Sequence, residues 1–535
     1  MAPVEKSVPW GSRFQKTGLI ALIATAAALP ARCALPCAQC HPREVAGYAA
    51  TPMAHSLGPA VPEPPGSFTH VASGSKFSVA LIGSRMAQRL ERNESTEEYE
   101  ATYAIGSGLH AIGYLIELQN HLFQSPFCYY PKRGWGLAPG YETLSTPNFS
   151  RPVTPACLFC HSGSARPKPD TLNTYQDPAF AEEEIGCQRC HGPAEAHLRN
   201  PVPGSIVNPA KLPARARDSV CEQCHLMGEA RVTNPGEQFS NFHPGQNLEE
   251  VFSVYVFEGS LDASGPNPFR VISQSQELAL SLCWRRSRGK LWCGTCHDPH
   301  QQPSDSRTYF RDRCLACHGV ALLKTHTKPN EDCIGCHMPI REVTDGAHTT
   351  FTDHRITRRA SPEDMAEVPV EERKLVAWQD PPAELAARDL GLADVEVGEK
   401  LRSKAIILAG MELLLSCWPK FPNDVAVLTA IGEVLFNVGD YEHSATTYER
   451  ALKLEPEVAT HYLHAAVARR AALDNPKAAD YLERALQLDP LLGDAYRQLG
   501  EIYSELGDTG MARRTRARYL RAFPGNAAAQ MGVPK

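Results

Sequence analysis

The stretch CLACHGVALLKTHTKPNEDCIGCHMP, residues 314–339, contains two Cys-x-x-Cys pairs, and a histidine follows each pair at once. Four cysteines at this spacing fit a zinc ribbon, in which a tetrahedral zinc ion takes four thiolates. A zinc site of that kind has no use for a histidine fixed after every pair. A covalently attached haem does, because two thiols add to its vinyl groups and the next histidine ligates the iron.

The other cysteines decide between the two interpretations. The same pentapeptide occurs seven times, whereas a chain of 535 residues with 18 Cys and 20 His would contain about 0.02 copies by chance. The sequence therefore predicts seven covalently bound c-type haems (haem c, iron) rather than zinc. Their attachment residues are Cys37, Cys40, His41; Cys157, Cys160, His161; Cys187, Cys190, His191; Cys221, Cys224, His225; Cys293, Cys296, His297; Cys314, Cys317, His318; and Cys333, Cys336, His337.

The N-terminus has the pattern of an export signal. Lys6, Arg13 and Lys16 precede an apolar run at 18–29, and small residues follow it up to Ala34. The run of about twelve residues is short for a membrane span, although an uncleaved anchor would show the same pattern. Covalent attachment of c-type haem takes place outside the cytoplasmic membrane. We therefore expect a signal peptide at 1–34 and a periplasmic or otherwise extracytoplasmic protein, soluble or peripherally attached to a membrane.

Composition and the remaining cysteines add little further chemistry. A formal net charge of −6 and 43% hydrophobic residues give no indication of nucleic-acid binding. Cys33 would leave with the signal peptide. Cys128, Cys283 and Cys417 are expected to be buried thiols, or one disulfide and one leftover thiol.

The mature sequence divides into two unlike parts. Residues 35–357 hold every motif and are rich in Pro and Gly, which predicts short helices and loops around haem macrocycles that supply the apolar interior. Between Cys40 and Cys157, alternating segments at 76–82, 98–106 and 113–119 predict a small antiparallel β insert. Charges and prolines at 358–382 predict a linker, or a strap along the haem domain.

Residues 383–535 contain an internal repeat. Pro422, Pro456, Pro490 and Pro524 follow one another at intervals of 34 residues. This period, with small residues where two helices would meet, is typical of tetratricopeptide repeats (TPR), although an unrelated helical bundle is the alternative. Three repeats are clear at 425–524, and a degenerate one precedes them. The predicted fold is mostly α with much irregular structure: a multihaem cytochrome c domain with a small β insert, followed by an α-helical TPR solenoid.

Several phrases of the sequence resemble a known group of proteins. They are CHPREVAGYAATPMAHS at the first motif, IGSGLH at 105–110, IGCQRCHGPAEAH at 185–197, CGTCHDPH at 293–300 and CHMPIREVTDGAHTTFTDHRI at 336–356. They are similar to multihaem cytochromes of the cytochrome c-552/c-554 type, distant relatives of hydroxylamine oxidoreductases, in the variant with C-terminal TPR repeats. The resemblance covers nearly the whole mature chain. It implies electron transfer, two protein ligands on most irons and a curved repeat surface for a partner.

The second iron ligands must come from residues outside the motifs. Five histidines within the phrases that resemble the family are predicted ligands, together with one just before the β insert: His110, His197, His300, His348, His354 and His70. Met53 occupies a place where relatives often carry a ligand histidine, and His55 follows it closely. A methionine ligand would raise the potential of its haem, but Met53 could also simply pack against haem. The remaining histidines are reserves (His121, His243 and His326) or expected packing and surface residues of the repeats (His443, His461 and His464).

Two functions fit these residues. The first is a non-enzymatic electron carrier that docks a redox partner on its TPR surface, which the number of motifs and candidate ligands favours. The second is a multihaem oxidoreductase of small nitrogen or sulfur compounds, which requires one haem with an open face. The sequence contains no Cys-x-x-Cys-Lys variant of the motif. High-spin or low-spin iron in the ferric protein would separate the two functions.

Overall fold

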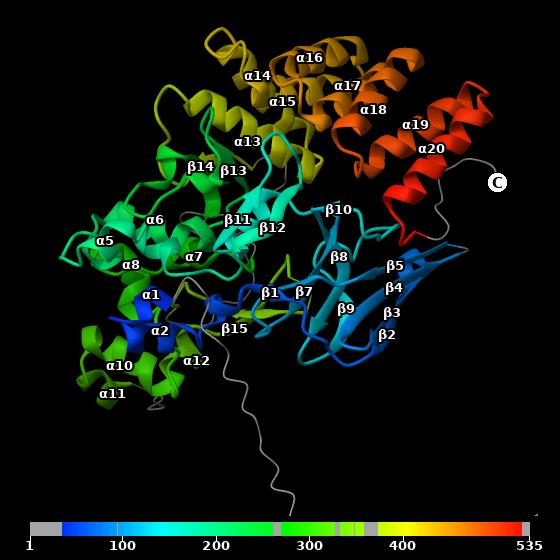
Figure 1. Cartoon of the computed structure of the whole chain (residues 1–535). Helices are drawn as coiled ribbons and strands as arrows, with labels where there is room; N and C mark the ends of the chain where they lie inside the picture. Colours follow the sequence, from blue (N-terminus) through cyan, green and yellow to red (C-terminus); the bar gives the residue numbers. More distant parts are fainter. Residues whose placement is uncertain are drawn as a thin grey trace, which may run out of the picture.

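The computed structural model describes residues 35–93, 95–260, 269–326, 332–346, 348–357 and 373–526. The predicted signal peptide and most of the predicted linker lie outside these residues. Figure 1 shows β-sheets on one side, short helices with the haem motifs on the other, and a solenoid of longer helices above both. In the described residues, no helix is long and apolar enough to cross a membrane.

The β insert consists of two antiparallel sheets that share one core. The larger sheet has the path β1-β6-β7-β8-β10 with β9 beside β8, and the smaller has the order β2-β3-β4-β5. Phe77 and Leu90 of the smaller sheet are buried in one cluster with Tyr114 and Phe127 of the larger. The strands are β1 (Leu57–Pro59), β2 (Gly66–His70), β3 (Ser75–Ile82), β4 (Arg85–Arg92), β5 (Ser95–Glu100), β6 (Tyr103–Ile105), β7 (Ile112–Leu118), β8 (His121–Tyr130), β9 (Gly134–Leu137) and β10 (Arg151–Pro152).

The prediction of strands at the three alternating segments is confirmed, but the prediction that the insert is small was wrong. Strand β4 was missed because Gln88 stands at an inward position, where it is fully buried and its side-chain oxygen accepts a hydrogen bond from Ser125 at 2.5 Å. Strand β8 was missed because it is buried along nearly its whole length and lacks alternation.

The haem-motif region is built from short helices, as predicted. Five of the seven motif histidines are the last residue of a helix, and His297 follows the end of another. The helices are α1 (Leu35–Ala38), α2 (Pro42–Tyr48), α3 (Pro155–His161), α4 (Gln188–His191), α5 (Glu195–Arg199), α6 (Ala214–His225), α7 (Gln274–Leu280), α8 (Leu282–Ser287), α9 (Cys293–Cys296), α10 (Ser306–His318), α11 (Ala321–Thr325) and α12 (Cys333–His337).

The haem-motif region also contains three small sheets. Strands β11 (Ser164–Pro167) and β12 (Tyr175–Glu182) pair with each other, as do β15 (Ile340–Glu342) and β16 (Thr350–Thr352). Strands β13 (Ala230–Thr233), β14 (Phe252–Phe257) and β17 (Leu375–Ala377) form the third sheet. Strand β17 lies within the segment 358–382 that was predicted as a linker or strap. That part of the segment therefore forms the edge strand of a sheet in the haem-motif region.

The C-terminal helices follow the predicted period. The first helices of the three repeats begin at residues 425, 459 and 493, and the second helices at 441, 475 and 509. Asp440, Asp474 and Asp508 cap the second helices, and each accepts a hydrogen bond from the backbone nitrogen three residues on. The helices are α13 (Ala386–Leu401), α14 (Lys404–Cys417), α15 (Val425–Asn437), α16 (Tyr441–Leu454), α17 (Ala459–Ala471), α18 (Asn475–Leu488), α19 (Gly493–Glu505) and α20 (Thr509–Ala522).

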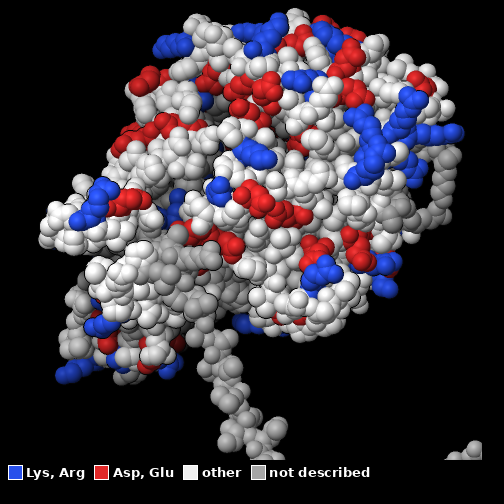
Figure 2. All heavy atoms as spheres, viewed as in Figure 1, with Lys and Arg blue, Asp and Glu red and all other residues white. Residues whose placement is uncertain are grey.

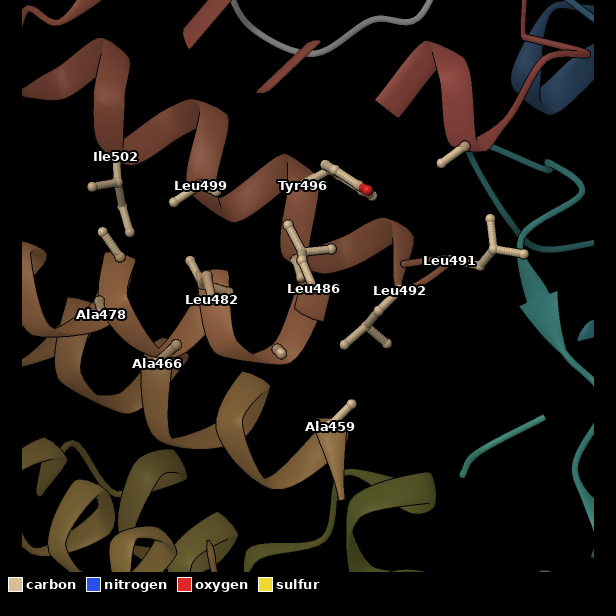
Figure 3. Packing of buried hydrophobic residues seen from close by; sticks show 14 of the residues in the cluster. Ala459, Ala466, Ala478, Leu482, Leu486, Leu491, Leu492, Tyr496, Leu499 and Ile502 are labelled. Carbon is tan, nitrogen blue, oxygen red and sulfur yellow. The ribbon is translucent and has the colours of Figure 1, made fainter. Parts of the chain in front are cut away.

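Small residues allow the paired helices to approach closely. A Cβ atom at Gly432 would lie 2.9 Å from the ring of Tyr448 on the neighbouring helix. Ser444, Ala478 and Ala512 occupy equivalent positions of successive repeats, and all three are buried. The packing continues through α17, α18 and α19, where Leu482, Leu486, Leu499 and other apolar side chains meet (Figure 3).

The solenoid contacts the rest of the chain at both of its ends. At one end, Ala393 and Val397 of α13 pack on the sheet β13-β14-β17, and the Arg388 guanidinium donates to the carbonyl of Thr233 at 3.0 Å. At the other end, Phe123 of β8 is buried with the solenoid core, and Gly525 accepts a backbone hydrogen bond from Glu98 of β5 at 2.9 Å. The solenoid is therefore fixed to both halves of the N-terminal region.

Candidate haem-binding sites

Most helices of the haem-motif region bury none of their residues against protein, although α3 and α6 bury some. Helix α10 has 13 residues and none of them is buried, and α2, α4, α5, α8, α9 and α12 likewise bury none. Helices this short are not stable alone in water and need an apolar partner. A haem attached through the two thiols of each motif would supply that partner, so the local structure fits the predicted cofactor.

The motifs lie against one another, although their order in space differs from their order in the chain. Four pairs of thiols from different motifs lie close enough to shift each other's pKa: Cys37 with Cys187, Cys160 with Cys224, Cys221 with Cys293, and Cys314 with Cys333. All the described cysteines are free thiols. The predicted burial of Cys128 and Cys417 is confirmed, whereas Cys283 is half-buried near Cys296 and Cys317.

Two further contacts join these pairs into one series. The third and fourth motifs meet where the Gln223 amide donates to the Arg189 carbonyl at 3.0 Å. The fifth and sixth meet through Cys296, which lies near Cys314 and Cys317. Numbered along the chain, the motifs thus run 1-3-4-5-6-7 in space, with motif 2 beside motif 4.

Three motif histidines each face a histidine that was predicted as a second ligand. His41 faces His197 with ring centres 6.4 Å apart, His191 faces His300 at 5.9 Å, and His297 faces His354 at 6.2 Å. Two iron–nitrogen bonds of about 2 Å, plus the distance from each nitrogen to its ring centre, add to about 6 Å. The spacing of all three pairs therefore fits one iron between two imidazoles.

Hydrogen bonds orient these rings. His191 Nδ1 contacts the Val207 carbonyl at 2.8 Å, His197 Nδ1 contacts the Ser205 hydroxyl at 2.8 Å, and His354 Nδ1 contacts the Thr352 carbonyl at 2.9 Å. A metal-bound histidine commonly donates its other ring N–H in this way, which fixes the tautomer. In each case Nε2 is left as the nitrogen that would bind iron.

The electrostatic environment favours neutral imidazoles, which is the form that binds metal. Burial lowers the pKa of His161, His225 and His354. Burial, followed by the nearby rings of His354 and His225, lowers the pKa of His297 to about 4. These rings therefore remain uncharged at neutral pH.

A fourth pair involves a histidine that the sequence had left in reserve. His326 follows α11 directly, and its ring centre lies 6.0 Å from that of His337 in the last motif. Its ring stands at 82° to the ring of His337, whereas the other three pairs make angles of 22°, 21° and 30°. No signal in the sequence distinguished His326 from His121 or His243, because it lies outside every phrase that resembles the family.

The remaining predicted ligands do not face a motif histidine. Both ring nitrogens of His70 are hydrogen-bonded, to Ser73 Oγ at 2.8 Å and to the Glu142 carbonyl at 3.0 Å. His55 Nε2 contacts the Ala49 carbonyl at 2.9 Å. Met53 is half-buried in the same short turn, and the ring opposite His41 is that of His197.

The last two candidates lie against the β insert or its neighbours. The ring centre of His110 lies 4.4 Å from that of Phe351. The ring of His348 is exposed, lies 5.5 Å from that of Tyr130 and accepts a hydrogen bond from Arg133.

Three motif histidines, His161, His225 and His318, have no second imidazole opposite them among the described residues. Gln274 lies near His225 and partly offsets the lowering of the His225 pKa by burial. In the described part of the chain, no three His, Cys, Asp or Glu side chains converge to hold a bare metal ion.

Comparisons with known proteins match both regions of the chain. Residues 142–192, which include the second and third motifs, match the family cytochrome c554 and c-prime. Residues 425–458 match a tetratricopeptide repeat. No curated protein matches the chain. The chain thus contains a cytochrome c554-type region, which implies covalently bound haem c, and TPR repeats. The relation to hydroxylamine oxidoreductases stays a prediction.

Solved structures similar to the chain include several of the protein MamA. One, MamA AMB-1, is 21% identical over 25% of this chain and 77% of its own, with a TM-score of 0.23. A second crystal structure of MamA is 22% identical over 25% and 73% of the two chains, also with a TM-score of 0.23. A third is 16% identical over 26% and 86%, with a TM-score of 0.23.

Proposed function

We propose that the chain is an exported seven-haem c-type cytochrome that transfers electrons and docks a redox partner on its TPR surface. The observation that carries the proposal is the contact series of motifs, 1-3-4-5-6-7 with 2 beside 4. Neighbouring thiols from two motifs would hold two haems close to each other. Electrons can pass between cofactors that are so close without any further protein group.

Iron with two imidazole ligands suits this role. We propose that His197, His300 and His354 are the second ligands of the first, third and fifth motifs. Two protein ligands occupy both faces of an iron, so that it exchanges electrons without binding a substrate. His110 and His348 remain proposed ligands, for haems whose motif histidine has no facing imidazole in the described residues. The hydrogen bonds of His70 and His55 favour structural roles for these two residues.

The partner surface is proposed on the repeats. TPR solenoids present extended surfaces for protein binding. Helix α20 carries five arginines and no acidic residue, and only Arg518 has an acidic partner within the described residues, Glu483 at 2.8 Å. Figure 2 shows basic side chains gathered at this end of the solenoid. This surface would favour a partner with an acidic face.

A haem count tests the proposal. A pyridine haemochrome assay of the purified protein, divided by protein concentration, should give about seven haems per chain. Redox titration followed in the visible spectrum should show that all of them reduce and reoxidise reversibly. A count of about five or fewer, or haem that acid–acetone extraction removes, would overturn the proposal.

The partner surface has its own test. The triple variant Arg513→Glu, Arg514→Glu, Arg521→Glu should bind immobilised polyglutamate at least tenfold more weakly at low salt than the unchanged protein does. A matched variant, Arg85→Glu with Arg89→Glu on β4, changes arginines that already pair with Glu100 and Glu98. Equal losses in both variants would place the basic surface elsewhere.

The second candidate function is a multihaem oxidoreductase with one open-faced haem. The observation in its favour is that His161, His225 and His318 have no facing imidazole in the described residues. An open face would give a high-spin ferric signal that cyanide converts to low spin. A fully low-spin protein would exclude this candidate.

A further inference from the structure

We infer that His326 is the second iron ligand of the haem attached to Cys333 and Cys336, and that the two imidazole planes cross at this haem alone among the four paired sites. The inference rests on the proposed function, because it assumes that the haem is attached. It assigns a metal ligand outside the motifs and outside the phrases that resemble the family.

Local structure holds both rings in place. His337 is the last residue of α12, and its Nδ1 lies 2.7 Å from the Thr357 carbonyl, while the Thr357 nitrogen donates to the His337 carbonyl at 3.1 Å. The first contact holds the ring of His337, and the second holds its backbone. His326 extends α11 by one backbone hydrogen bond, from its nitrogen to the Leu322 carbonyl at 2.9 Å. The centre of its ring lies 6.0 Å from that of His337, within the 5.9–6.4 Å of the other three pairs.

The angle between the rings is what sets this pair apart. When both rings contain the line between the two nitrogens and the iron, the angle between the rings equals the angle between the ligand planes. That angle is 82° here and 30° or less in the other pairs. Thr357 holds the ring of His337, and the end of α11 places the backbone of His326.

The angle has an electronic consequence. Each imidazole interacts most strongly with the iron d orbital that is perpendicular to its own plane. Two nearly parallel rings act on the same orbital and split the pair, whereas two crossed rings act on one orbital each and leave the pair close in energy. A ferric low-spin iron with crossed ligands therefore gives a very anisotropic electron paramagnetic resonance (EPR) signal with a single feature at low field. Parallel ligands give a rhombic signal with three resolved features.

The test removes the ligand and observes that signal. His326→Ala should keep about seven haems per chain in the haemochrome assay, lose one highly anisotropic low-spin component, and gain one high-spin component. Added imidazole should return that haem to low spin. His243→Ala, which removes an exposed histidine, is the matched control and should leave the EPR spectrum unchanged.

Each other result has a defined meaning. Loss of the anisotropic signal in His348→Ala or His110→Ala, but not in His326→Ala, would overturn the inference. If His326→Ala lowers the haem count, His326→Met decides, because a methionine ligand should retain low-spin iron and raise the potential of one haem. An unchanged set of potentials in that variant would also overturn the inference. A low haem count in every variant and in the unchanged protein would instead contradict the proposed function.

Discussion

Two helices of almost equal length show how differently the two regions of this molecule are stabilised. Helix α18 has 14 residues and buries Ala478, Ala479, Leu482, Ala485 and Leu486 against its neighbours. Helix α10 has 13 residues and buries none. The first obtains its apolar contacts from other helices, and the second ends in a motif that we propose attaches a large apolar ring. The repeat region should therefore fold without a cofactor, whereas the folding of the motif region should depend on bound haem.

The largest expected effect is the loss of haem at the centre of the motif series. Cys221→Ala with Cys224→Ala removes the thiols that contact both Cys160 and Cys293. Two neighbouring haems then lose an apolar partner, so we expect loss of more than one haem per chain. Mass spectrometry and the haemochrome assay measure this.

The matched variant acts at the end of the series. Cys333→Ala with Cys336→Ala breaks a contact with only one other motif, through Cys314, and should remove a single haem. In both variants the far-ultraviolet circular dichroism of the repeats should persist. Equal haem losses in the two variants would break the comparison between the regions.

The next effect lies in the repeat core. Leu482→Ala, at a side chain that is 1% exposed, should lower the free energy of unfolding of the solenoid by about 2–5 kcal/mol. The visible spectrum should not change, because this cluster contains no residue of a haem motif. Chemical denaturation followed by circular dichroism and by haem absorbance separates the two regions. Leu506→Ala, at an exposed side chain, is the control and should change stability by less than about 0.5 kcal/mol.

A buried carboxyl group predicts a pH dependence of the same region. Burial raises the pKa of Asp394 in α13 to about 7, from an ordinary value near 4. Because the folded state binds the proton more tightly than the unfolded state, solenoid stability should fall as pH rises from about 4 to about 7. Asp394→Asn should flatten this slope and stabilise the protein by about 1–3 kcal/mol at pH 8. A parallel shift at all pH values would mean that Asp394 is not the titrating group.

The smallest effect is expected at the junction between the regions. Asp489 accepts hydrogen bonds from His121 Nε2 at 3.1 Å and from the Leu491 nitrogen at 2.9 Å. Asp489→Ala leaves both groups without this acceptor and should cost about 1–2 kcal/mol. The two regions should then unfold in more clearly separate steps. An unchanged separation of the two unfolding steps would show that Phe123 and the other junction contacts suffice.

Much of this organisation could be predicted from local patterns. The 34-residue period placed the repeat helices, and the alternating segments placed strands β3, β5, β6 and β7. Strands β4 and β8 escaped because a buried Gln88 and a doubly buried strand do not alternate. Three of the six predicted second ligands, His197, His300 and His354, face motif histidines. His326 was not selected, and both ring nitrogens of His70 contact other groups.

The sequence by itself determined the features that depend only on residues close to one another in the chain. The spacing of two thiols and one histidine is a local covalent requirement, and the helix pairs of the repeats follow from local periodicity and capping. Only the tertiary structure decided which motifs touch, which histidine faces which, and how His121 meets Asp489 across 368 residues. The physical reason is that the entropic cost of closing a loop grows slowly with its length. A facing ring can therefore come from almost anywhere in the chain, and packing alone selects it.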